Sequence, residues 1–584
     1  MTDITSLRPL AAVLVSAVAI APILLSGSRP NVRESWTAVA ALGKFGIVAS
    51  MVPGVLAGDT YVTDLGSFLP GARFALEADA LGVLFALLAS FLWIVTSSYS
   101  IGYMRGLDEH GQTRYFAAFA ASVSAAVGVA FASNLLVIFV FYELLTVATY
   151  PLVAHDETDE ARSAARKYLA YTFGGGVAVL AGTALVYWLT GTVAFTPGGI
   201  EGLASADPLF ARLAFALLAS GFGVKAALMP LHSWLPDAMV APTPVSALLH
   251  AVAVVKSGVF GIARIVLDVF GPETVGDLGM GLPLAAVAAF TLVVASVIAL
   301  RQDNLKRRLA FSTVSQLSYI VLGLAVLAPT SLVGGLLHIP AHGFMKITLF
   351  FAAGALHVET HTDDISDMAG IGRRMPLTMA AFAVAAAGMA GIPLVAGFVS
   401  KYFLLIGSIS AGQTLFAVAL LVSGVMNIGY FWPVVYTAFF ESPEETDEKP
   451  LIGGPLGGRL SWGRAAVADP DADADTDAVA DGGDDVTDRD DTDEPNRGTV
   501  DAHGHDDDHG PDDAHGHTDA HGHGAGHAGG WERRKWTGGE STWFILAPIL
   551  VTALGSIVLG IVPDGAVFLR IVRLIVTGAT GVSV

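Results

Sequence analysis

Long apolar stretches recur along most of this chain, with short polar connections between them. About 20 consecutive apolar residues are enough to cross the hydrocarbon core of a bilayer as an α-helix. The pattern therefore predicts an all-α polytopic membrane protein. Counting the stretches predicts about fourteen spans, which start near residues 9, 36, 78, 114, 133, 165, 208, 243, 281, 308, 332, 377, 413 and 541.

Composition strengthens this prediction, because 53% of the 584 residues are hydrophobic and only 14% are charged. The chain contains no cysteine, which excludes disulfides, thiolate metal sites and cysteine nucleophiles. The first apolar stretch lacks a clear cleavage site for a signal peptidase. We therefore expect it to remain as a membrane span.

One polar segment, residues 441–540, separates the last two predicted spans. It holds 27 acidic and 8 basic residues and so accounts for nearly all of the net charge of −20. Such a composition cannot build an apolar core, and we predict a disordered, solvated insert. Its eight histidines, between His503 and His527, could bind zinc or nickel. Their spacing among glycines favours a flexible tether instead, and we predict no metal site.

Arginine and lysine gather in alternate connections between the predicted spans. By the positive-inside rule these connections face the cytoplasm. This orientation places the N-terminus and the C-terminus outside and the acidic insert in the cytoplasm. The basic clusters are Arg29 with Arg33, Arg105 with Arg114, Arg162 with Arg166 and Lys167, Arg301 with Lys306 to Arg308, and Arg373 with Arg374.

Glycine and proline interrupt two spans, one before Pro230 and the other at Pro393. Proline lacks a backbone donor, so each should free a carbonyl close to a lysine: that of Ala226 near Lys225, and one near Lys401. One more span follows each interruption, which predicts two inverted five-helix repeats around a midplane site. The expected domains are N-terminal helices in 1–110, the repeats in 111–270 and 271–440, the insert in 441–540, and a last helix with the tail in 541–584.

Ionisable side chains inside the spans are the main functional signal. An unpaired charge there costs several kcal/mol, so such residues mark ion pathways. We predict that Glu143 pairs with Lys225, and that opening this pair loads or releases a proton; a purely structural ion pair is the alternative. The five residues that carry this signal are Glu143, Lys225, Lys256, Lys346 and Lys401.

His338, His342 and Lys346 follow one another at intervals of four residues, which places them on one face of a helix. Two histidines and a lysine make a graded set of proton acceptors, and the alternative is a polar seam for helix packing. Lys401 would be the exit group.

Three further residues are second-tier candidates. Six residues of helix rotate the chain by about 240°, so His250 and Lys256 should point about 120° apart. Lys256 is then assigned to a water-filled interior, while a lone His250 is more often a hydrogen-bonded core residue. His232 and Asp237 could bridge the broken helix to the next one, and a structural role is at least as well supported for them.

Several kinds of site have no signature in this sequence. The spans contain no cluster of carboxylates and hydroxyls that would cage Na⁺, and no nucleotide-phosphate loop, flavin motif or iron–sulfur ligand set is present. We therefore expect no cofactor on this chain, a role in transport rather than in enzymatic catalysis, and other membrane proteins of a hetero-oligomeric complex as partners. No feature points to nucleic acid.

Five segments strongly resemble the proton-conducting membrane transporter family, which joins the large antiporter-like proteins of respiratory complex I to the A-type and D-type members of the Mrp-type multisubunit Na⁺/H⁺ antiporter. The likeness covers about residues 70–440 and implies a fourteen-helix core with two inverted repeats. It also implies a hydrophilic axis at Glu143, Lys225, Lys256, Lys346 and Lys401. The segments are GVKAALMPLHSWLPDAM, HAVAVVKSGVFGIAR, DNLKRRLAFSTVSQLSYI, HIPAHGFMKITLFFAAGALH and MAGIPLVAGFVSK.

Within that family, Lys401 and the chain length most resemble the D-type member of the Mrp-type antiporter, and the aspartate excess is similar to that of proteins from halophilic archaea. The resemblance implies a proton-translocating component of a Na⁺/H⁺ antiporter complex in the plasma membrane. The alternative is a proton-pumping component of a complex I type NADH-quinone oxidoreductase or a membrane-bound hydrogenase. A structural membrane anchor is a weaker third hypothesis, because it leaves the buried charges unexplained.

Overall fold

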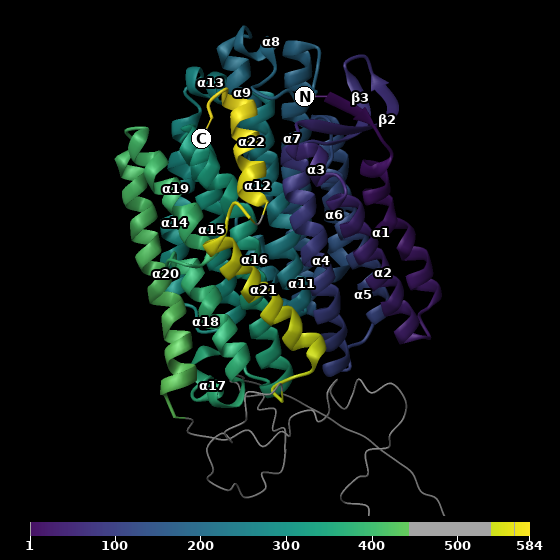
Figure 1. Cartoon of the computed structure of the whole chain (residues 1–584), viewed down its shortest axis with the longest axis vertical. Helices are drawn as coiled ribbons and strands as arrows, with labels where there is room; N and C mark the ends of the chain where they lie inside the picture. The colour runs from purple at the N-terminus through teal and green to yellow at the C-terminus, as the bar shows by residue number, and fades with distance from the viewer. Residues whose placement is uncertain (1, 443–538, 566, 584) are drawn as a thin grey trace, which may run out of the picture. The chain divides into compact units, whose positions relative to one another are not determined.

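The computed structural model describes residues 2–442, 539–565 and 567–583, which form a bundle of long helices (Figure 1). Within these residues, thirteen helices are long and apolar enough to cross a membrane, and the fourteenth predicted span consists of two shorter apolar helices. The prediction of a polytopic helical membrane protein is confirmed. The predicted insert lies almost wholly outside the described residues.

The spanning helices are α1 (Arg8–Leu25), α2 (Pro30–Ala49) with its continuation α3 (Val52–Leu56), α4 (Ala80–Gly106), α5 (Gln112–Ala130), α6 (Leu135–Val153), α7 (Asp159–Thr190), α9 (Pro208–Lys225), the composite α11 (Thr243–Ala247), η2 (Leu248–Val252), α12 (Val254–Arg264) and η3 (Ile265–Val269), then α14 (Gly281–Leu300), α15 (Leu305–Ala325), α16 (Pro329–Thr360), α18 (Pro376–Ala390) with α19 (Ala396–Ser410), α20 (Thr414–Phe440) and α21 (Trp543–Ile561). The short connecting helices are α8 (Glu201–Ala204), α10 (Trp234–Asp237), η1 (Ala238–Val240), α13 (Pro272–Asp277), η4 (Ile365–Asp367) and α17 (Ile371–Arg374).

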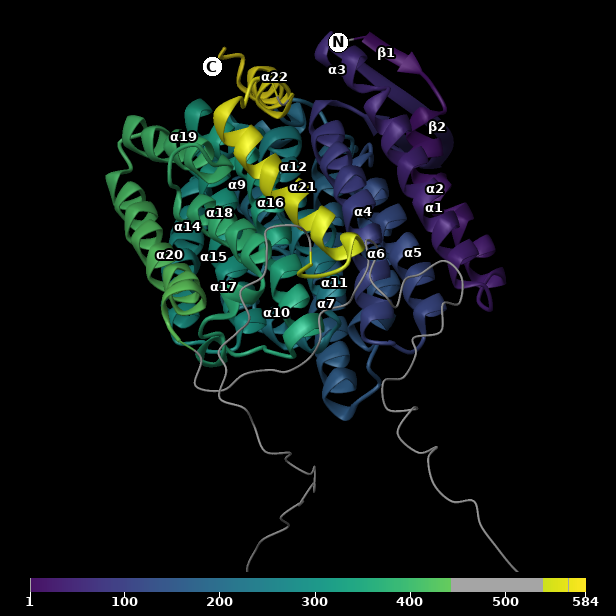
Figure 2. The ribbon, with the colours of Figure 1, turned by 60° about the horizontal axis from the view of Figure 1, so that its bottom comes forward.

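Three spans occupy the centre of the bundle: the one from Thr243 to Val269, α15 and α16. The most apolar window of each is fully enclosed by protein, whereas one third to a half of the equivalent window is buried in peripheral helices such as α1, α7 and α20. In Figure 2, α16 is surrounded by other helices, with α20 at one edge of the bundle and α1 and α2 at the other. A polar side chain on these central spans therefore faces protein rather than lipid.

The two predicted interruptions take different forms. Helix α9 ends at Lys225, and the next spanning helix begins only at Thr243, so the first break is an irregular connection after the lysine. The second break lies within a span, between α18 and α19, where Gly391 has φ +90°. A positive φ is readily adopted by glycine, which lets the chain leave its helical course here.

Two features of the fold were not predicted. A small three-stranded sheet, β1 (Thr2–Thr5), β2 (Asp59–Leu69) and β3 (Ala72–Ala78), pairs β1 parallel and β3 antiparallel to β2. An amphipathic helix, α22 (Phe568–Thr580), follows α21 and packs on α16 and α4. The sheet, α22 and both chain ends lie on the same side of the bundle (Figure 1).

The two predicted repeats show parallel features, although their inverted symmetry stays a prediction. The second helix of each, α6 and α15, starts at an asparagine whose side chain caps the helix: Asn134 accepts from Leu136 and Val137, and Asn304 accepts from Arg307. The third helices, α7 and α16, each contain 32 residues. The fourth helix, α9 or α18 with α19, carries or adjoins the break.

Candidate functional site

A lysine and a histidine on neighbouring central helices form the middle of the site. The Lys256 Nζ on α12 lies 2.9 Å from His342 Nδ1 on α16, and it also donates to the carbonyl of Ile339 at 3.1 Å. Both side chains are fully buried. Because amine and imidazole can each hold the proton that lies between them, this pair is suited to proton transfer.

His338 lies one turn from His342 on α16, with ring centroids 6.2 Å apart. Its Nδ1 is 2.8 Å from the Ser400 hydroxyl on α19, and its Nε2 is 2.9 Å from Gln316 Oε1 on α15. A neutral ring has one N–H and one lone pair, so the amide oxygen fixes the proton on Nε2 and leaves Nδ1 to accept from the hydroxyl. Ser400 and Gln316 were not predicted, because hydroxyl and amide residues give no distinctive signal in an apolar span.

Lys401 follows Ser400 directly and reaches into the second helix break. Its amine donates to the carbonyl of Met389, which also accepts from the Asn427 side chain at 3.0 Å. In a continuous helix this carbonyl would accept from residue 393, and Pro393 has no N–H to donate. The predicted free carbonyl near Lys401 is therefore present.

Lys346 shares the predicted face of α16 with the two histidines, but its amine turns to another helix. It donates to the Leu309 carbonyl at 3.1 Å and to the Ser312 hydroxyl, both on α15. Among the described residues, His342 is bonded through Lys256 instead, and its Nε2 is buried without a partner. The face is continuous, but the hydrogen bonds leave it sideways.

The predicted ion pair between Glu143 and Lys225 is not closed. The Lys225 amine, fully buried, donates to the Tyr142 carbonyl at 2.6 Å and lies 3.4 Å from the centre of the Tyr142 ring. Glu143 is half-buried beside Gly176 of α7, and its Oε2 has no partner in the described structure. The prediction that Lys225 would use the Ala226 carbonyl is also wrong, because α9 ends at the lysine and its side chain turns back to α6.

The second-tier histidines and Asp237 fit structural roles. His250 and Lys256 were expected to point apart, yet both contact α16: the His250 ring lies 4.8 Å from that of Phe350. The π-helical turn Leu248–Val252 between them uses more residues per turn, which changes their relative rotation. His232 lies near Phe311, and Asp237 bonds Lys167 of α7 at 2.6 Å, so it does not bridge to the next span.

A sixth ionisable side chain lies inside a span and was not among the predicted candidates. Lys44 on α2 is fully buried, 3.4 Å from the Val123 carbonyl and 5.6 Å from the centre of the Trp93 ring. It belongs to the N-terminal helices, and its neighbours lie on α4 and α5 rather than on α12, α16 or α19. Lys44 therefore offers a matched comparison, a buried lysine of the same kind outside the central site.

Removing the Ser400 hydroxyl tests the arrangement around His338. In Ser400→Ala the buried Nδ1 loses its partner, which costs about 1–3 kcal/mol and shifts the ring out of place. We expect proton transport to fall by about tenfold. The control is Ser408→Ala, a buried serine of the same helix whose hydroxyl bonds the Leu404 carbonyl of its own helix. Equal transport in the two variants would argue against a role for Ser400.

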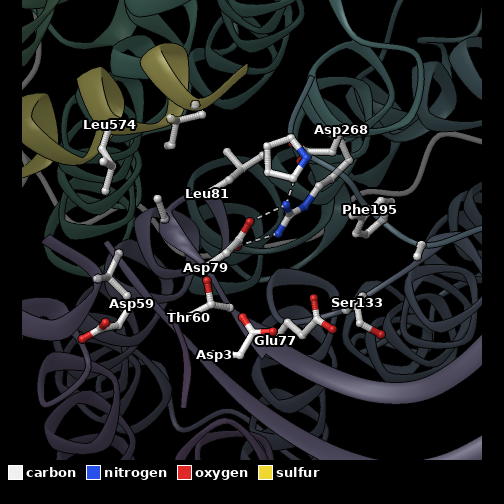
Figure 3. A pocket seen from close by; sticks show the side chains of 18 of the residues that line it. Asp3, Asp59, Thr60, Glu77, Asp79, Leu81, Ser133, Phe195, Asp268 and Leu574 are labelled. Carbon is white, nitrogen blue, oxygen red and sulfur yellow. Dashed lines mark hydrogen bonds and ion pairs between the residues drawn. The ribbon is translucent and has the colours of Figure 1, made fainter. Parts of the chain in front are cut away.

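A cavity of about 290 Å³ opens beside the small sheet, on the side of the chain ends (Figure 3). Arg264 lies in it, bonded to both oxygens of Asp79 at 2.7 and 2.8 Å and to Asp268 at 2.7 Å. Glu77 also lines the cavity, next to Asp3. Burial, and then the Asp79 carboxylate, raise the pKa of Glu77 from 4.5 to about 7.

This raised pKa predicts a stability effect with a definite sign. The folded chain holds a proton on Glu77 that the unfolded chain releases, so stability falls as pH rises from about 4.5 through about 7. Glu77→Gln keeps the neutral form. At pH 8 it should be more stable than the parent by about 1–2 kcal/mol, a figure reduced for solvent screening, and equal to it at pH 4. Thermal unfolding midpoints at the two pH values measure this difference.

Comparison with known proteins gives consistent matches. The family model described as NADH:quinone oxidoreductase/Mrp antiporter, transmembrane, matches residues 132–427. NADH-quinone oxidoreductase subunit N of Desulforudis audaxviator is 32% identical over 432 residues, covering 73% of this chain and 85% of the relative. The A-type member of the Na⁺/H⁺ antiporter of Alkalihalophilus pseudofirmus is 35% identical over 348 residues, covering 57% of this chain. This chain spans only 42% of that longer relative.

Among solved structures, a chain of the Mrp complex from Dietzia sp. superposes with a TM-score of 0.74 at 22% identity, and the match covers 98% of both chains. At this identity the likeness concerns the fold. It extends beyond the matched family region to the N-terminal helices and the end of the chain.

Proposed function

Because this chain belongs to the NADH:quinone oxidoreductase/Mrp antiporter transmembrane family, we propose that it is the proton-translocating component of a multisubunit Na⁺/H⁺ antiporter, most like the D-type member of the Mrp antiporter. The observation that carries the proposal is the buried line of proton-holding side chains through the central helices. A fold shared over the full length with a chain of an Mrp complex supports the choice of complex.

In the proposed relay, protons pass between Lys256 and His342, then to His338, the Ser400 hydroxyl and Lys401. The first of these steps joins groups in direct contact, and so does the step from His338 to Ser400. The His342 and His338 rings, 6.2 Å apart, need a water or a ring rotation between them. Lys346, held by Ser312, is a side branch that can store a proton.

Lys225 feeds this line from α9. Helices α9 and α12 cross at Gly258, where an added Cβ would collide with the Ala226 nitrogen. This close crossing, two residues after Lys256 and one after Lys225, brings both lysines to the same contact region. We propose that the Lys225 amine alternates between the Tyr142 carbonyl and the Glu143 carboxylate, and that a proton moves on when the pair is open.

The amines cannot all be charged at once. Four lysines and one half-buried carboxylate line the proposed route, so full protonation would leave at least three positive charges uncompensated in apolar surroundings. Each such charge costs several kcal/mol. A proton that arrives at one amine therefore favours the release of another, which is the coupling that a relay needs.

The proposed orientation follows the basic connections. The ends of α4 and α6 and the starts of α5, α7 and α15 carry most of the arginines and lysines, while the chain ends and the sheet lie opposite (Figure 1). We propose that the basic side faces the cytoplasm of a plasma membrane and the chain ends face outside. The cation would pass through partner membrane proteins of the complex, since no oxygen cage for Na⁺ occurs among the described spans.

A second candidate function is a proton-pumping component of a redox complex, because the oxidoreductase relative from Desulforudis audaxviator is covered over 85% of its length. Purifying the native complex under mild conditions separates the two. Small hydrophobic membrane proteins alone would support the antiporter, and co-purifying iron–sulfur proteins would reject it. Either outcome keeps this chain as a membrane component without a cofactor of its own.

Deleting residues 465–530 should leave transport nearly unchanged. The deletion removes most of the acidic, histidine-rich segment, whose composition is that of a solvated tether. After the segment, Glu540 accepts from the backbone N–H of Leu377 and Thr378 and so caps α18, and this contact is retained. Na⁺-dependent proton movement in vesicles measures the outcome. Loss of exchange in an assembled complex would overturn the tether interpretation; the halophilic origin stays a prediction.

A further inference from the structure

Three ligand-type side chains meet where two connections on the basic side of the bundle lie together. Glu109 and His110 follow α4, and His155 follows α6. The Glu109 Oε2 lies 3.9 Å from His110 Nδ1 and 4.0 Å from His155 Nε2. All three ligand atoms are within 4.8 Å of one another. None of these residues belongs to the proposed relay.

His155 supplies the observation that points to a ligand. Its side chain is fully buried, yet neither ring nitrogen has a hydrogen-bond partner in the described structure. A buried polar atom without a partner costs about 1–3 kcal/mol. Its Nε2 lies toward the Glu109 carboxylate rather than an apolar wall. The neighbouring rings of His110 and Tyr115, at 4.9 and 5.8 Å, hold the imidazole in this orientation.

The local charges favour a cation at this point. Asp156, next to His155, adds a second carboxylate whose Oδ1 is also buried without a partner among the described residues. Arg114, which lies close by, is neutralised by Glu157 and donates to the His155 carbonyl at 3.1 Å rather than to the ring. Burial lowers the pKa of His155 to about 4, so its ring is neutral near pH 7 and keeps a free lone pair.

We propose that Glu109, His110 and His155 form a binding site for a divalent transition metal, with zinc as the best-fitting ion. Two imidazole nitrogens and a carboxylate oxygen are a common zinc ligand set. Ligands about 2.0–2.2 Å from a tetrahedral ion lie about 3.3–3.6 Å apart. The observed separations of 3.9 and 4.0 Å therefore close with a shift of a few tenths of an ångström. Hard ions such as Mg²⁺ prefer all-oxygen sites.

A bound ion would join the connection after α4 to the connection after α6. Helix α6 carries Tyr142 and Glu143, so the ion would fix one end of the helix against which Lys225 rests. Backbone amides of residues 107–111 and 154–158 should then exchange hydrogen more slowly when zinc is added. Amides of a connection far from the cluster, such as residues 411–413, should not change.

Zinc titration by calorimetry tests the site in the full-length chain. To remove competing ligands, the eight histidines between His503 and His527 are replaced by glutamine in every protein compared. We expect one zinc ion per chain, and at least about tenfold weaker binding in His155→Phe and in His110→Gln, since even loss of an outer-sphere partner costs that much. The control is His361→Gln, an exposed histidine outside the cluster.

His110 also guards against a folding artefact. Its side chain is 53% exposed, so His110→Gln should fold normally even if His155→Phe does not. Equal zinc affinity in the parent, His110→Gln and His361→Gln would overturn the proposal. So would the absence of stoichiometric zinc binding by the parent, which would mean that His155 is satisfied by water.

Discussion

Lys256→Met is expected to reduce Na⁺-dependent proton transport at least about a hundredfold, the usual effect of removing a positioned proton donor or acceptor. Methionine fills a similar volume but holds no proton. His342 Nδ1, 2.9 Å from the amine, would lose the group with which it exchanges a proton. The substitution lies on a span that is enclosed by protein on all sides, so lipid contacts do not change.

Vesicle measurements with a pH-sensitive dye give the result, with assembly of the complex checked by purification. The matched control is Lys44→Met, which removes another fully buried lysine from a span outside the relay. We expect that variant to assemble and to transport at close to the parent rate. Comparable losses in both variants would show that any buried lysine is needed for assembly or stability, and would remove the reason to single out Lys256.

Lys225→Arg should fail nearly as completely as Lys225→Ala, with transport reduced at least about tenfold in each. A guanidinium stays protonated throughout the working pH range, so arginine keeps the charge but cannot pass on its proton. Its planar group is also too large to occupy the position of an amine that lies 3.4 Å from the centre of the Tyr142 ring. Charge alone therefore does not rescue the site.

Glu143→Ala is the companion variant, and it should also abolish exchange without loss of the complex. Because Glu143 is half-buried and its Oε2 makes no bond within the described structure, its removal should disturb folding little. Lys44→Arg serves as the control for a guanidinium in a span. Near-normal transport in Lys225→Arg would show that deprotonation at this position is unnecessary. Near-normal transport in Glu143→Ala would remove the proposed alternation of the Lys225 amine.

Most of the architecture could be predicted from the sequence, because long apolar runs are a strong local signal. The span positions and the second break at Pro393 are visible directly, and the freed Met389 carbonyl beside Lys401 follows from the chemistry of proline. The buried lysines stand out for the same reason, since charge is rare in such runs. Lys44 carries the same signal, although it was not predicted as a candidate.

Contacts between distant segments were beyond local patterns. Lys256 and His342 are 86 residues apart, and no periodicity indicates that they touch. Ser400 and Gln316 became site residues only through their bonds to His338. The π-helical turn after Ala247 changed the direction of His250, and the end of α9 at Lys225 turned that lysine toward Tyr142. Each is a property of packing rather than of composition.

The central claim is that buried amines gain and lose protons during transport. The most direct test is nitrogen NMR of the lysine side chains in the assembled, membrane-reconstituted complex, labelled at Nζ and recorded across the pH range of activity. Signals that vanish in Lys225→Met and Lys256→Met identify the two amines. The account predicts that they change from the ammonium to the neutral amine within this range. Ammonium signals at every active pH would contradict it.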